Sequence, residues 1–221
     1  MFSSTVTDFW RVGAPGGVDV IVDDELPANR ALSLLVPDDG GAVLTVTSAL
    51  AAAAGIAGGR VTADELAIVL ERVPLNGPDH LFYFPVDQRP APGSASRRLG
   101  PEDAALFDAF TAAAPDDDLD EAFVELDHWL VVGTLVDGRL ASAASMYPWR
   151  ESRLADLGVI TLPEFRGRGL ARATVRAIAA HALELGFEPQ YRCQLDNAAS
   201  IALAASAGLE HFGTWDVIHT E

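Results

Sequence analysis

The sequence contains no lysine, so all 15 of its basic residues are arginine, and they are outnumbered by 32 acidic residues. Without lysine the chain cannot form a P-loop, whose lysine contacts the β- and γ-phosphates of a nucleotide, and it cannot form a Schiff base. The net charge of −17 repels nucleic acid and anionic membrane surfaces and mildly favours cationic partners. We therefore expect neither nucleic acid nor a membrane as a binding partner.

Cysteine and long apolar runs are scarce as well. The single cysteine, Cys193, excludes an internal disulfide and a multi-cysteine zinc site, and we expect no bound metal. The longest apolar candidate, residues 42–57, is interrupted by polar residues and is too short to span a membrane. The first residues, Met-Phe-Ser-Ser-Thr, lack the basic charge that opens a signal peptide, so we predict a cytoplasmic protein.

The chain has enough apolar residues for a packed core, since 49% of its 221 residues are hydrophobic. This length suits one large domain or one and a half ordinary ones. Residues 87–101 carry three prolines and several small residues, which makes them the strongest boundary signal. We predict an N-terminal α/β region of unknown role over residues 1–95 and a second domain over residues 96–221.

Strand and helix signals alternate before this boundary. Strands are predicted at residues 18–22, 43–47 and 80–84. Thr62 and Glu65 form a capping box that opens an amphipathic helix. Nothing in this region has the pattern of a chemical site.

A richer alternation of helices and strands follows the boundary. Helices are expected from residue 101 to about 113 and from the acidic run 116–118 to about 127. A hairpin turn at Asp137–Gly138 joins strands at 129–136 and 140–146. The remaining predicted elements are strands at 154–161, 190–195 and 209–219 and helices at about 169–185 and 198–207.

The strand at 154–161 runs through a turn rich in glycine and arginine into a helix. This arrangement directs unpaired backbone N–H groups and the positive end of a helix dipole at one point, where an anion would bind. Four arginines fall within eleven residues, namely Arg166, Arg168, Arg172 and Arg176. Such a basic spot in an acidic protein favours an anion site over its alternative, a solvated helix face.

The turn Arg166-Gly-Arg-Gly-Leu-Ala171 fits the pattern Arg/Gln-x-x-Gly-x-Gly/Ala. A Rossmann dinucleotide site does not fit, because Arg172 occupies the place of a third small residue. The turn continues a Thr-x-Pro-x-x-Arg-Gly-x-Gly motif that starts at Thr161, and a second block begins a short helix at Asn197 and closes it with Gly208 and an apolar residue. On these two blocks the chain resembles the GCN5-related N-acetyltransferases (GNAT), in particular a bacterial branch of that family.

The resemblance covers residues 96–221 and implies an α/β (α+β) GNAT fold, with a mixed, mostly antiparallel central sheet flanked by helices. It does not extend to residues 1–95, for which a degenerate second copy of the fold is left open. It implies acetyl-CoA as the cosubstrate, held by backbone groups of the strand, by the turn and by the second block. The residues that it assigns to CoA binding are Val159, Ile160, Thr161, Arg166, Gly167, Arg168, Gly169, Leu170, Ala171, Arg172, Asn197 and Ser200.

The resemblance also implies direct attack of a neutral amine on the acetyl thioester, which needs a general base and backbone N–H groups for the oxyanion. Our first candidate base is Asp156, an acid within an otherwise apolar strand, and our second is Glu151 in the preceding loop. The structural alternatives are that Asp156 is an ordinary strand-edge residue or that it forms an ion pair with Arg153.

One position departs from the family pattern. Many relatives carry a tyrosine that protonates the leaving thiolate, and this chain has Ala204 there. Tyr191, Cys193 or water are the candidate substitutes. Two hypotheses therefore stand: an N-acetyltransferase acting on an amine of a small molecule or peptide, or a catalytically silent acyl-CoA-binding regulatory module. The acceptor is not identified, and a homodimer is left open.

Overall fold

The computed structural model describes residues 1–56, 58–91 and 96–218. They form two compact units, and neither unit is a single stretch of sequence. The first unit combines Met1–Thr5, Tyr83–Tyr191 and Ala199–Glu210. The second unit combines Val6–Phe82, Arg192–Ala198 and the segment from His211. The boundary that we predicted near residue 95 lies within the first unit.

In the first unit the strands lie in the order β10-β9-β8-β7-β6. The β9–β10 pair is parallel and the other pairs are antiparallel, which gives the mixed sheet that we predicted. The strands are β6 (Ser96–Arg98), β7 (Leu130–Val136), β8 (Arg139–Pro148), β9 (Leu154–Thr161) and β10 (Glu188–Gln194).

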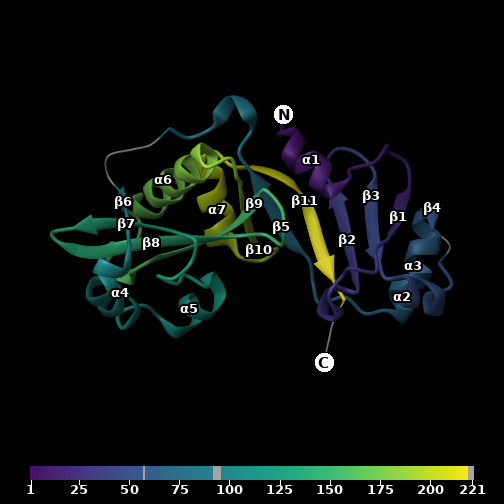
Figure 1. Cartoon of the computed structure of the whole chain (residues 1–221), viewed down its shortest axis with the longest axis horizontal. Coiled ribbons are helices and arrows are strands. Elements are labelled where there is room, and N and C mark those ends of the chain that lie inside the picture. Colours follow the sequence, from purple (N-terminus) through teal and green to yellow (C-terminus); the bar gives the residue numbers. More distant parts are fainter. Residues whose placement is uncertain (57, 92–95, 219–221) are drawn as a thin grey trace. The chain divides into compact units, whose positions relative to one another are not determined.

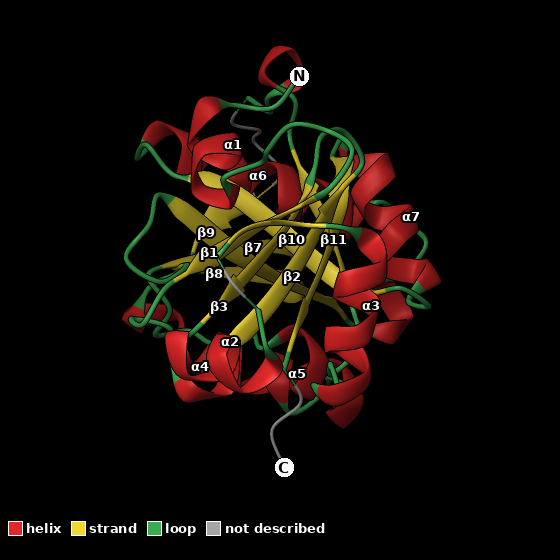
Figure 2. Ribbon diagram, turned by 90° about the vertical axis from the view of Figure 1, so that its right-hand side faces the viewer, coloured by secondary structure: helices red, strands yellow, loops and turns green. Residues whose placement is uncertain are grey.

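Helices cover both faces of this sheet. In Figures 1 and 2, α6 lies on one face, and α4 and α5 lie on the other. Phe107 and Phe110 of α4 pack into an apolar core with Ala143 and Ile160 of the sheet. On the opposite face, Thr174 of α6 lies with its hydroxyl 2.7 Å from that of a sheet threonine. The helical elements are η3 (Pro101–Asp103), α4 (Ala104–Thr111), α5 (Asp116–Ala122), η4 (Pro163–Phe165), α6 (Leu170–Glu184) and α7 (Ala198–Ala207).

The second unit has its own strands, in the order β4-β1-β3-β2-β11-β5. Its β1–β3 pair is parallel, whereas β1–β4, β2–β3 and β2–β11 are antiparallel. The capping box that we predicted is present at the start of α3, where the Glu65 carboxylate accepts from the Thr62 N–H at 2.7 Å. The strands are β1 (Val18–Val22), β2 (Leu32–Pro37), β3 (Ala42–Val46), β4 (Gly59–Val61), β5 (Asp79–Tyr83) and β11 (Glu210–Val217). The helical elements of the N-terminal sequence are α1 (Ser4–Trp10), η1 (Ala28–Arg30), α2 (Ser48–Ala54), α3 (Ala63–Arg72) and η2 (Val86–Gln88).

The segment 87–101, which carries our predicted boundary, contains an edge strand, since Ser96–Arg98 pairs with β7; residues 92–95 lie outside the described part of the chain. One local expectation was wrong. Helix α5 ends at Ala122 and not near residue 127, because Phe123 adopts a left-handed backbone conformation with φ of 47°.

Across residues 1–56, 58–91 and 96–218, no helix combines the length and the apolar character that a membrane span requires.

Gly158 of β9 permits close packing of α5 against the sheet. A Cβ atom at this position would stand 1.8 Å from the carbonyl oxygen of Ala122. Gly158→Ala must displace the end of α5, so we expect a loss of about 1–3 kcal/mol in the free energy of unfolding, measured by urea denaturation. The matched control is Gly58→Ala, where the nearest atom would be 3.8 Å away. Equal stability of the two variants would contradict this packing.

Asp103 is the residue directly before α4, at its N-cap position. Its carboxylate, on a residue that is 8% exposed, accepts from Arg97 at 2.9 and 2.6 Å and from the Gly100 N–H at 3.1 Å. The Arg97 hydrogen bond first, and the Gly100 N–H second, lower the pKa of Asp103 from 3.8 to about 2. A folded pKa below the unfolded value means that this stabilisation is complete above pH 3.8 and disappears as the pH falls through about 2.

Asp103→Asn should therefore lower the free energy of unfolding at neutral pH by about 1–3 kcal/mol. In denaturant titrations at a series of pH values, the wild type and the variant should converge as the pH falls from 3.8 toward 2. Asp108→Asn, on an exposed position of α4, serves as the control. A difference between Asp103→Asn and the wild type that does not change with pH would refute the assignment.

Candidate functional site

Strand β9 is paired along its whole length on one edge and only in part on the other. Its ladder with β8 extends to Thr161, whereas its ladder with β10 ends where Leu157 faces Tyr191. In the described part of the chain, residues 158–161 thus have a backbone edge that β10 does not cover. The first half of β9 is enclosed and its second half is open.

The register decides which residues face that open edge. The Leu162 N–H donates to the Ala141 carbonyl beside β8 at 3.0 Å. Backbone N–H and C=O groups point alternately to the two sides along an antiparallel pair. Those of Val159 and Thr161 therefore point toward the open edge, and those of Ile160 point toward β8. Of the three residues that we assigned to the pantetheine arm, Val159 and Thr161 therefore have backbone groups at the open edge, where the Thr161 carbonyl already accepts from the Arg166 Nε at 3.1 Å.

The turn between β9 and α6 has two residues in the left-handed region. Gly167 has φ of 72°, and Gly169, the N-cap of α6, has φ of 75°. A Cβ atom at Gly167 would meet nothing within 4 Å, so the backbone conformation, rather than space, favours glycine there. Left-handed residues within a turn are one of the backbone conformations from which anion-binding concavities are built.

The first turn of helix α6 directly follows the glycine turn. The N–H groups of Leu170, Ala171 and Arg172 lie in its first turn and have no helical carbonyl to bond. The helix is 15 residues long, and its first turn contains no acidic residue. Its dipole therefore adds a positive potential at the turn that no neighbouring carboxylate on the helix cancels.

Two of the four arginines bind the protein itself. The Arg166 Nε donates to the Thr161 carbonyl at 3.1 Å, and its Nη2 donates to Asp118 of α5 at 2.5 Å. The Arg176 Nη1 donates to the carbonyl of Ala207 at the end of α7 at 2.6 Å. Arg166 thus fixes the turn against α5, and Arg176 joins α6 to α7.

The other two arginines are exposed at the turn. The Arg168 guanidinium carbon lies 5.5 Å from the centre of the Phe165 ring, and Arg172 follows in the first turn of α6. A guanidinium can donate two parallel hydrogen bonds to a phosphate. Arg168 and Arg172 are therefore the side chains best placed to meet a phosphate group at this turn.

A buried polar chain crosses the enclosed half of β9. The Asp156 carboxylate accepts from the Tyr147 hydroxyl at 3.1 Å and from the Gln190 Nε2 at 3.0 Å. Gln190 in turn accepts from the Tyr83 hydroxyl at 2.5 Å. Asp156 is 6% exposed and Gln190 is fully buried, so both oxygens of the carboxylate are held in one orientation.

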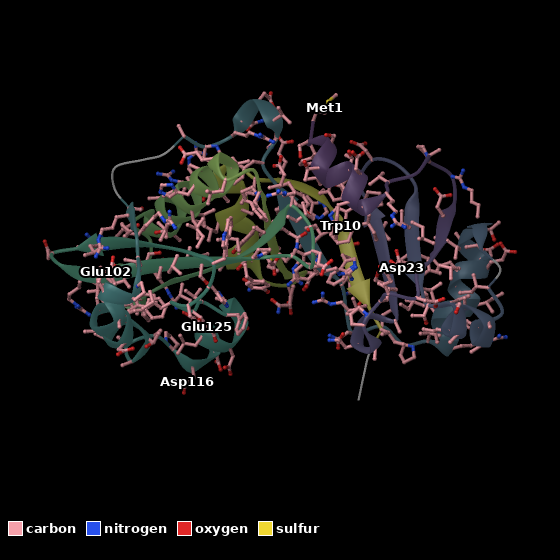
Figure 3. All side chains as sticks on the ribbon, viewed as in Figure 1. Met1, Trp10, Asp23, Glu102, Asp116 and Glu125 are labelled. Carbon is pink, nitrogen blue, oxygen red and sulfur yellow. The ribbon has the colours of Figure 1, made fainter. Side chains whose placement is uncertain are left out.

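An aromatic cluster lies beside Asp156 on the α4–α5 face. The rings of Phe123, His128 and Tyr147 have centroids 5.0–5.9 Å apart. The His128 Nδ1 lies 2.8 Å from the Ser145 hydroxyl, and its Nε2 lies 3.5 Å from the Glu125 carboxylate. Phe123 is 51% exposed despite its size and its left-handed backbone. Figure 3 shows Glu125 beside α5, on the side of the sheet that also carries Asp116.

The second candidate base has a different environment. Glu151 is exposed in the turn between β8 and β9. The Arg153 guanidinium, our alternative partner for Asp156, lies 5.0 Å from the centre of the Phe187 ring. Of the two candidate bases, it is Asp156 that takes part in the buried polar chain with Tyr147 and Gln190.

The second sequence block divides between the units. Asn197 belongs to the second unit and directly precedes α7, whose residues Ser200 and Ala204 belong to the first. Ala204, which replaces the usual tyrosine, is fully buried.

Of the candidate substitutes for that tyrosine, Cys193 is disfavoured by its environment. Burial, and secondarily the Asp79 carboxylate, raise the pKa of the Cys193 thiol to about 11. A thiol with this pKa is a weaker acid than the CoA thiol, whose pKa is roughly 8.5, so it is a poor proton donor to the leaving thiolate. Tyr191 is buried at the end of the β9–β10 ladder.

Sequence reasoning missed three contributors to the site. Tyr83 and Gln190 were predicted only as strand residues, and His128 was not considered. The polar chain joins residues from four separate segments, so no local motif marks it. The one available signal was the mixture of polar residues within otherwise apolar strands, as at Gln190 and Asp156.

The chain matches known proteins over the same region. Residues 103–209 match the model of the acetyltransferase (GNAT) family. A 56-residue segment is 39% identical to an uncharacterized N-acetyltransferase, YdfB, of Bacillus subtilis, and covers 25% of this chain and 22% of that relative's length.

Two solved structures share the fold. A putative GNAT acetyltransferase from Novosphingobium aromaticivorans has a TM-score of 0.53 at 24% identity, covering 67% of this chain and 68% of that one. A GNAT-family acetyltransferase from Colwellia psychrerythraea has a TM-score of 0.52 at 18% identity, covering 72% and 62%. The sequence match and the shared fold agree with the resemblance drawn from the two motif blocks. Residues 103–209 of this chain therefore belong to the GNAT family of acetyltransferases.

Proposed function

We propose that the protein is an acetyl-CoA-dependent N-acetyltransferase that acts on an amine of a small molecule or peptide. One observation carries this proposal: the left-handed glycine turn and the N-terminus of α6 directly follow the open edge of β9. An anion site at the end of a free strand edge suits a ligand that has phosphates at one end and an amide-containing arm.

The donor would bind in two parts. The pyrophosphate sits at the amides of Gly167 to Ala171, with charge supplied by Arg168 and Arg172. The pantetheine amides pair with the backbone of Val159 and Thr161. Ser200 holds the arm as well, a role that rests on the family resemblance. The resemblance assigns Asn197 to the same arm, but Asn197 belongs to the second unit. Arg166 supports the turn and reaches a phosphate only if it exchanges its Asp118 partner.

The reaction needs one proton acceptor and one oxyanion site. Asp156 removes a proton from the acceptor ammonium, and the neutral amine attacks the acetyl carbonyl carbon. A C–N bond forms, and the tetrahedral oxyanion is stabilised by backbone N–H groups on the open edge of β9. The carbonyl then re-forms and the C–S bond breaks, so that CoA leaves as a thiolate. The nitrogen releases its second proton to water, which gives the neutral amide, and the thiolate, whose conjugate thiol has a pKa of roughly 8.5, takes up a proton from water. Tyr147 and Gln190 position the base.

The aromatic cluster of Phe123, His128 and Tyr147 supports the proposal that the acceptor is cationic. Aromatic faces attract an ammonium group, and the Glu125 carboxylate adjoins the cluster at His128. The exposed ring of Phe123 and the Tyr147 hydroxyl on Asp156 would guide the amine toward the base.

The first test is release of CoA thiol by the purified protein across a panel of amines, together with equilibrium binding of acetyl-CoA. We expect turnover with at least one amine and its loss in Gly169→Glu, which places a side chain and a negative charge at the helix N-terminus. The double variant Arg168→Gln/Arg172→Gln should weaken acetyl-CoA binding by about tenfold to a hundredfold, because two charge-assisted contacts are removed.

Arg60→Gln/Arg72→Gln is the control for net charge, because it removes two arginines from the second unit. If both double variants bind acetyl-CoA equally well, the turn is not the phosphate site. Tight binding of acetyl-CoA without turnover on any amine would instead identify a silent acyl-CoA-binding module, which the buried Ala204 favours.

A second prediction separates the two candidate bases. Asp156→Asn should lower kcat by about a hundredfold or more while acetyl-CoA still binds, because general base catalysis contributes this much. Glu151→Gln, the same chemical change on an exposed turn, should leave kcat within about twofold. Steady-state kinetics with a saturating donor decide between them. A large loss for Glu151→Gln with an active Asp156→Asn would reverse the assignment.

A further inference from the structure

Tyr83 contributes to the polar chain of the candidate active site from outside the region that matches the family. It is the last residue of β5, whereas the family match begins at residue 103. Tyr83, Gln190 and Asp156 belong to the same compact unit, so the chain that joins them lies within one body. The N-terminal part of the sequence thus supplies one member of this chain.

The hydrogen bonds of the chain have a direction. The Tyr83 hydroxyl donates to the Gln190 Oε1 at 2.5 Å, and the Gln190 Nε2 donates to the Asp156 Oδ1 at 3.0 Å. A side-chain amide accepts only at its oxygen and donates only from its nitrogen. While Tyr83 donates to the oxygen of Gln190, the nitrogen faces Asp156 and gives the carboxylate a donor.

Burial makes the orientation of this amide consequential. Gln190 is fully buried and Tyr83 is 1% exposed, so water does not replace a hydrogen bond that either side chain loses. Reversal of the amide would place its oxygen against the Asp156 carboxylate. It would also take from the Tyr83 hydroxyl the oxygen to which that hydroxyl now donates. Tyr83 therefore disfavours the reversed orientation.

The orientation of the amide favours one protonation state of the base. An N–H donor stabilises a carboxylate, whereas an amide oxygen in the same place would accept a hydrogen bond from a protonated carboxyl group. The other oxygen of Asp156 accepts from the Tyr147 hydroxyl, so in the present orientation both oxygens face donors. A general base must be ionised before it can take a proton from the acceptor.

We propose that Tyr83 is a positioning residue for acetyl transfer, which holds the Gln190 amide in the orientation that keeps Asp156 ionised. This inference rests on the proposed function, in which Asp156 is the general base. It gives the sequence before residue 103 a part in the reaction, because β5 ends in the hydroxyl on which the chain depends.

Tyr83→Phe tests this role, because it removes the hydroxyl and keeps the ring. Without the hydroxyl the amide can reverse and accept from a protonated Asp156. We expect the acid limb of the kcat profile to move to higher pH by about 0.5–1 pH unit, the effect of one lost hydrogen bond. Acetyl-CoA binding should stay within about twofold of the wild type, because Tyr83 is not in the proposed donor site.

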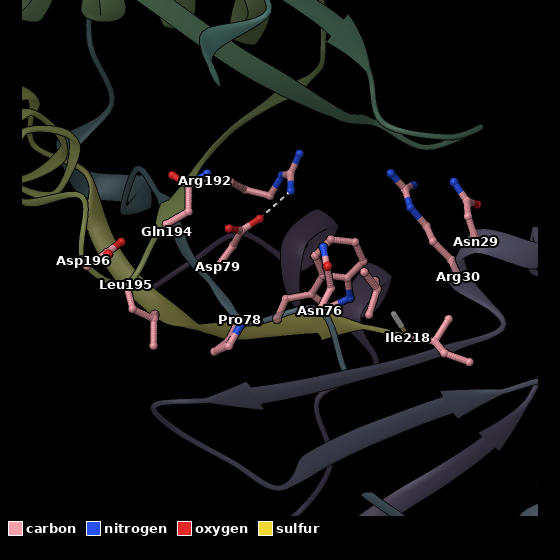
Figure 4. A pocket seen from close by; sticks show the side chains of 13 residues that line it. Asn29, Arg30, Asn76, Pro78, Asp79, Arg192, Gln194, Leu195, Asp196 and Ile218 are labelled. Atoms are coloured by element: carbon pink, nitrogen blue, oxygen red, sulfur yellow. Dashed lines mark hydrogen bonds and ion pairs between the residues drawn. The ribbon is translucent and has the colours of Figure 1, made fainter. Parts of the chain in front are cut away.

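Asp79→Asn is the matched control, at the first residue of the same strand. Figure 4 shows Asp79 bonded to Arg192, whose Nη1 donates to it at 2.9 Å within the second unit. This variant also removes a polar contact of β5, but outside the chain that leads to Asp156, so the acid limb should not move. Equal shifts in Tyr83→Phe and Asp79→Asn would assign the effect to β5 as a whole and overturn the proposal.

A second variant tests whether Tyr83 acts through the amide. Gln190→Met removes the donor to Asp156 and should move the acid limb in the same direction. Adding Tyr83→Phe to Gln190→Met should cause no further shift, because the two residues act in series. A further shift in the double variant would mean that Tyr83 affects the base by another route, and the proposal would be wrong.

A third measurement does not require turnover. The carboxyl carbon of Asp156, labelled with ¹³C and assigned by its absence in Asp156→Asn, is titrated by NMR in the full chain. Its titration midpoint should rise in Tyr83→Phe and not in Asp79→Asn; an unchanged midpoint in Tyr83→Phe overturns the role of Tyr83. A raised midpoint in a protein that acetylates no amine supports the role of Tyr83 in orienting Gln190 and contradicts the proposed acetyl transfer.

Discussion

The unequal pairing of β9 is the constraint on which the candidate active site depends. One edge of the strand is bonded to β8 throughout, so its register is fixed. The other edge is bonded to β10 only as far as Leu157. This single difference divides the strand: its enclosed half orients Asp156 within a polar chain, and its second half has a backbone edge that β10 does not cover. Because the glycine turn follows directly, the proposed base, the strand edge and the proposed anion site have a set spacing along the chain.

Arginine has two separate roles around that strand. Arg166 and Arg176 are bonded to backbone carbonyls of the protein, at Thr161 and Ala207. Arg168 and Arg172 are exposed beside the helix N-terminus. The planar fork of a guanidinium suits both roles, since it can bind carbonyl oxygens or a phosphate with several hydrogen bonds. A chain without lysine can therefore build both the support and the charge of an anion site from one residue type.

The parts of this structure that the sequence predicted are those governed by neighbours in the chain. The capping box at Thr62, the limits of β9 and α7, and the turn at Gly167–Gly169 all follow from local chemistry. The partners of residues far apart in sequence were not accessible in this way. Gln190 links Tyr83 to Asp156, and nothing in the local pattern of any of these residues indicates the others.

Short edge strands were also not predictable from the sequence. Ser96–Arg98 is too short to have a recognisable alternation, and it forms a strand because β7 offers an unpaired edge next to it. The end of α5 shows a different limit. Phe123 has no sequence preference for the left-handed region, yet it ends α5 in that conformation with its N–H bonded to the Leu119 carbonyl.

The pairing of β2 with β11 has a consequence for biosynthesis. It joins residues 33–37 to residues 213–217, so β2 leaves the ribosome long before its partner exists. At roughly 5–20 residues per second, the nascent second unit would wait on the order of 10–40 s with one edge of β2 uncovered. An unpaired edge can bond to other chains. Completion of this unit is therefore coupled to synthesis of the GNAT-family region (residues 103–209) that precedes β11, and a ribosome that stalls within that region leaves both units unfinished.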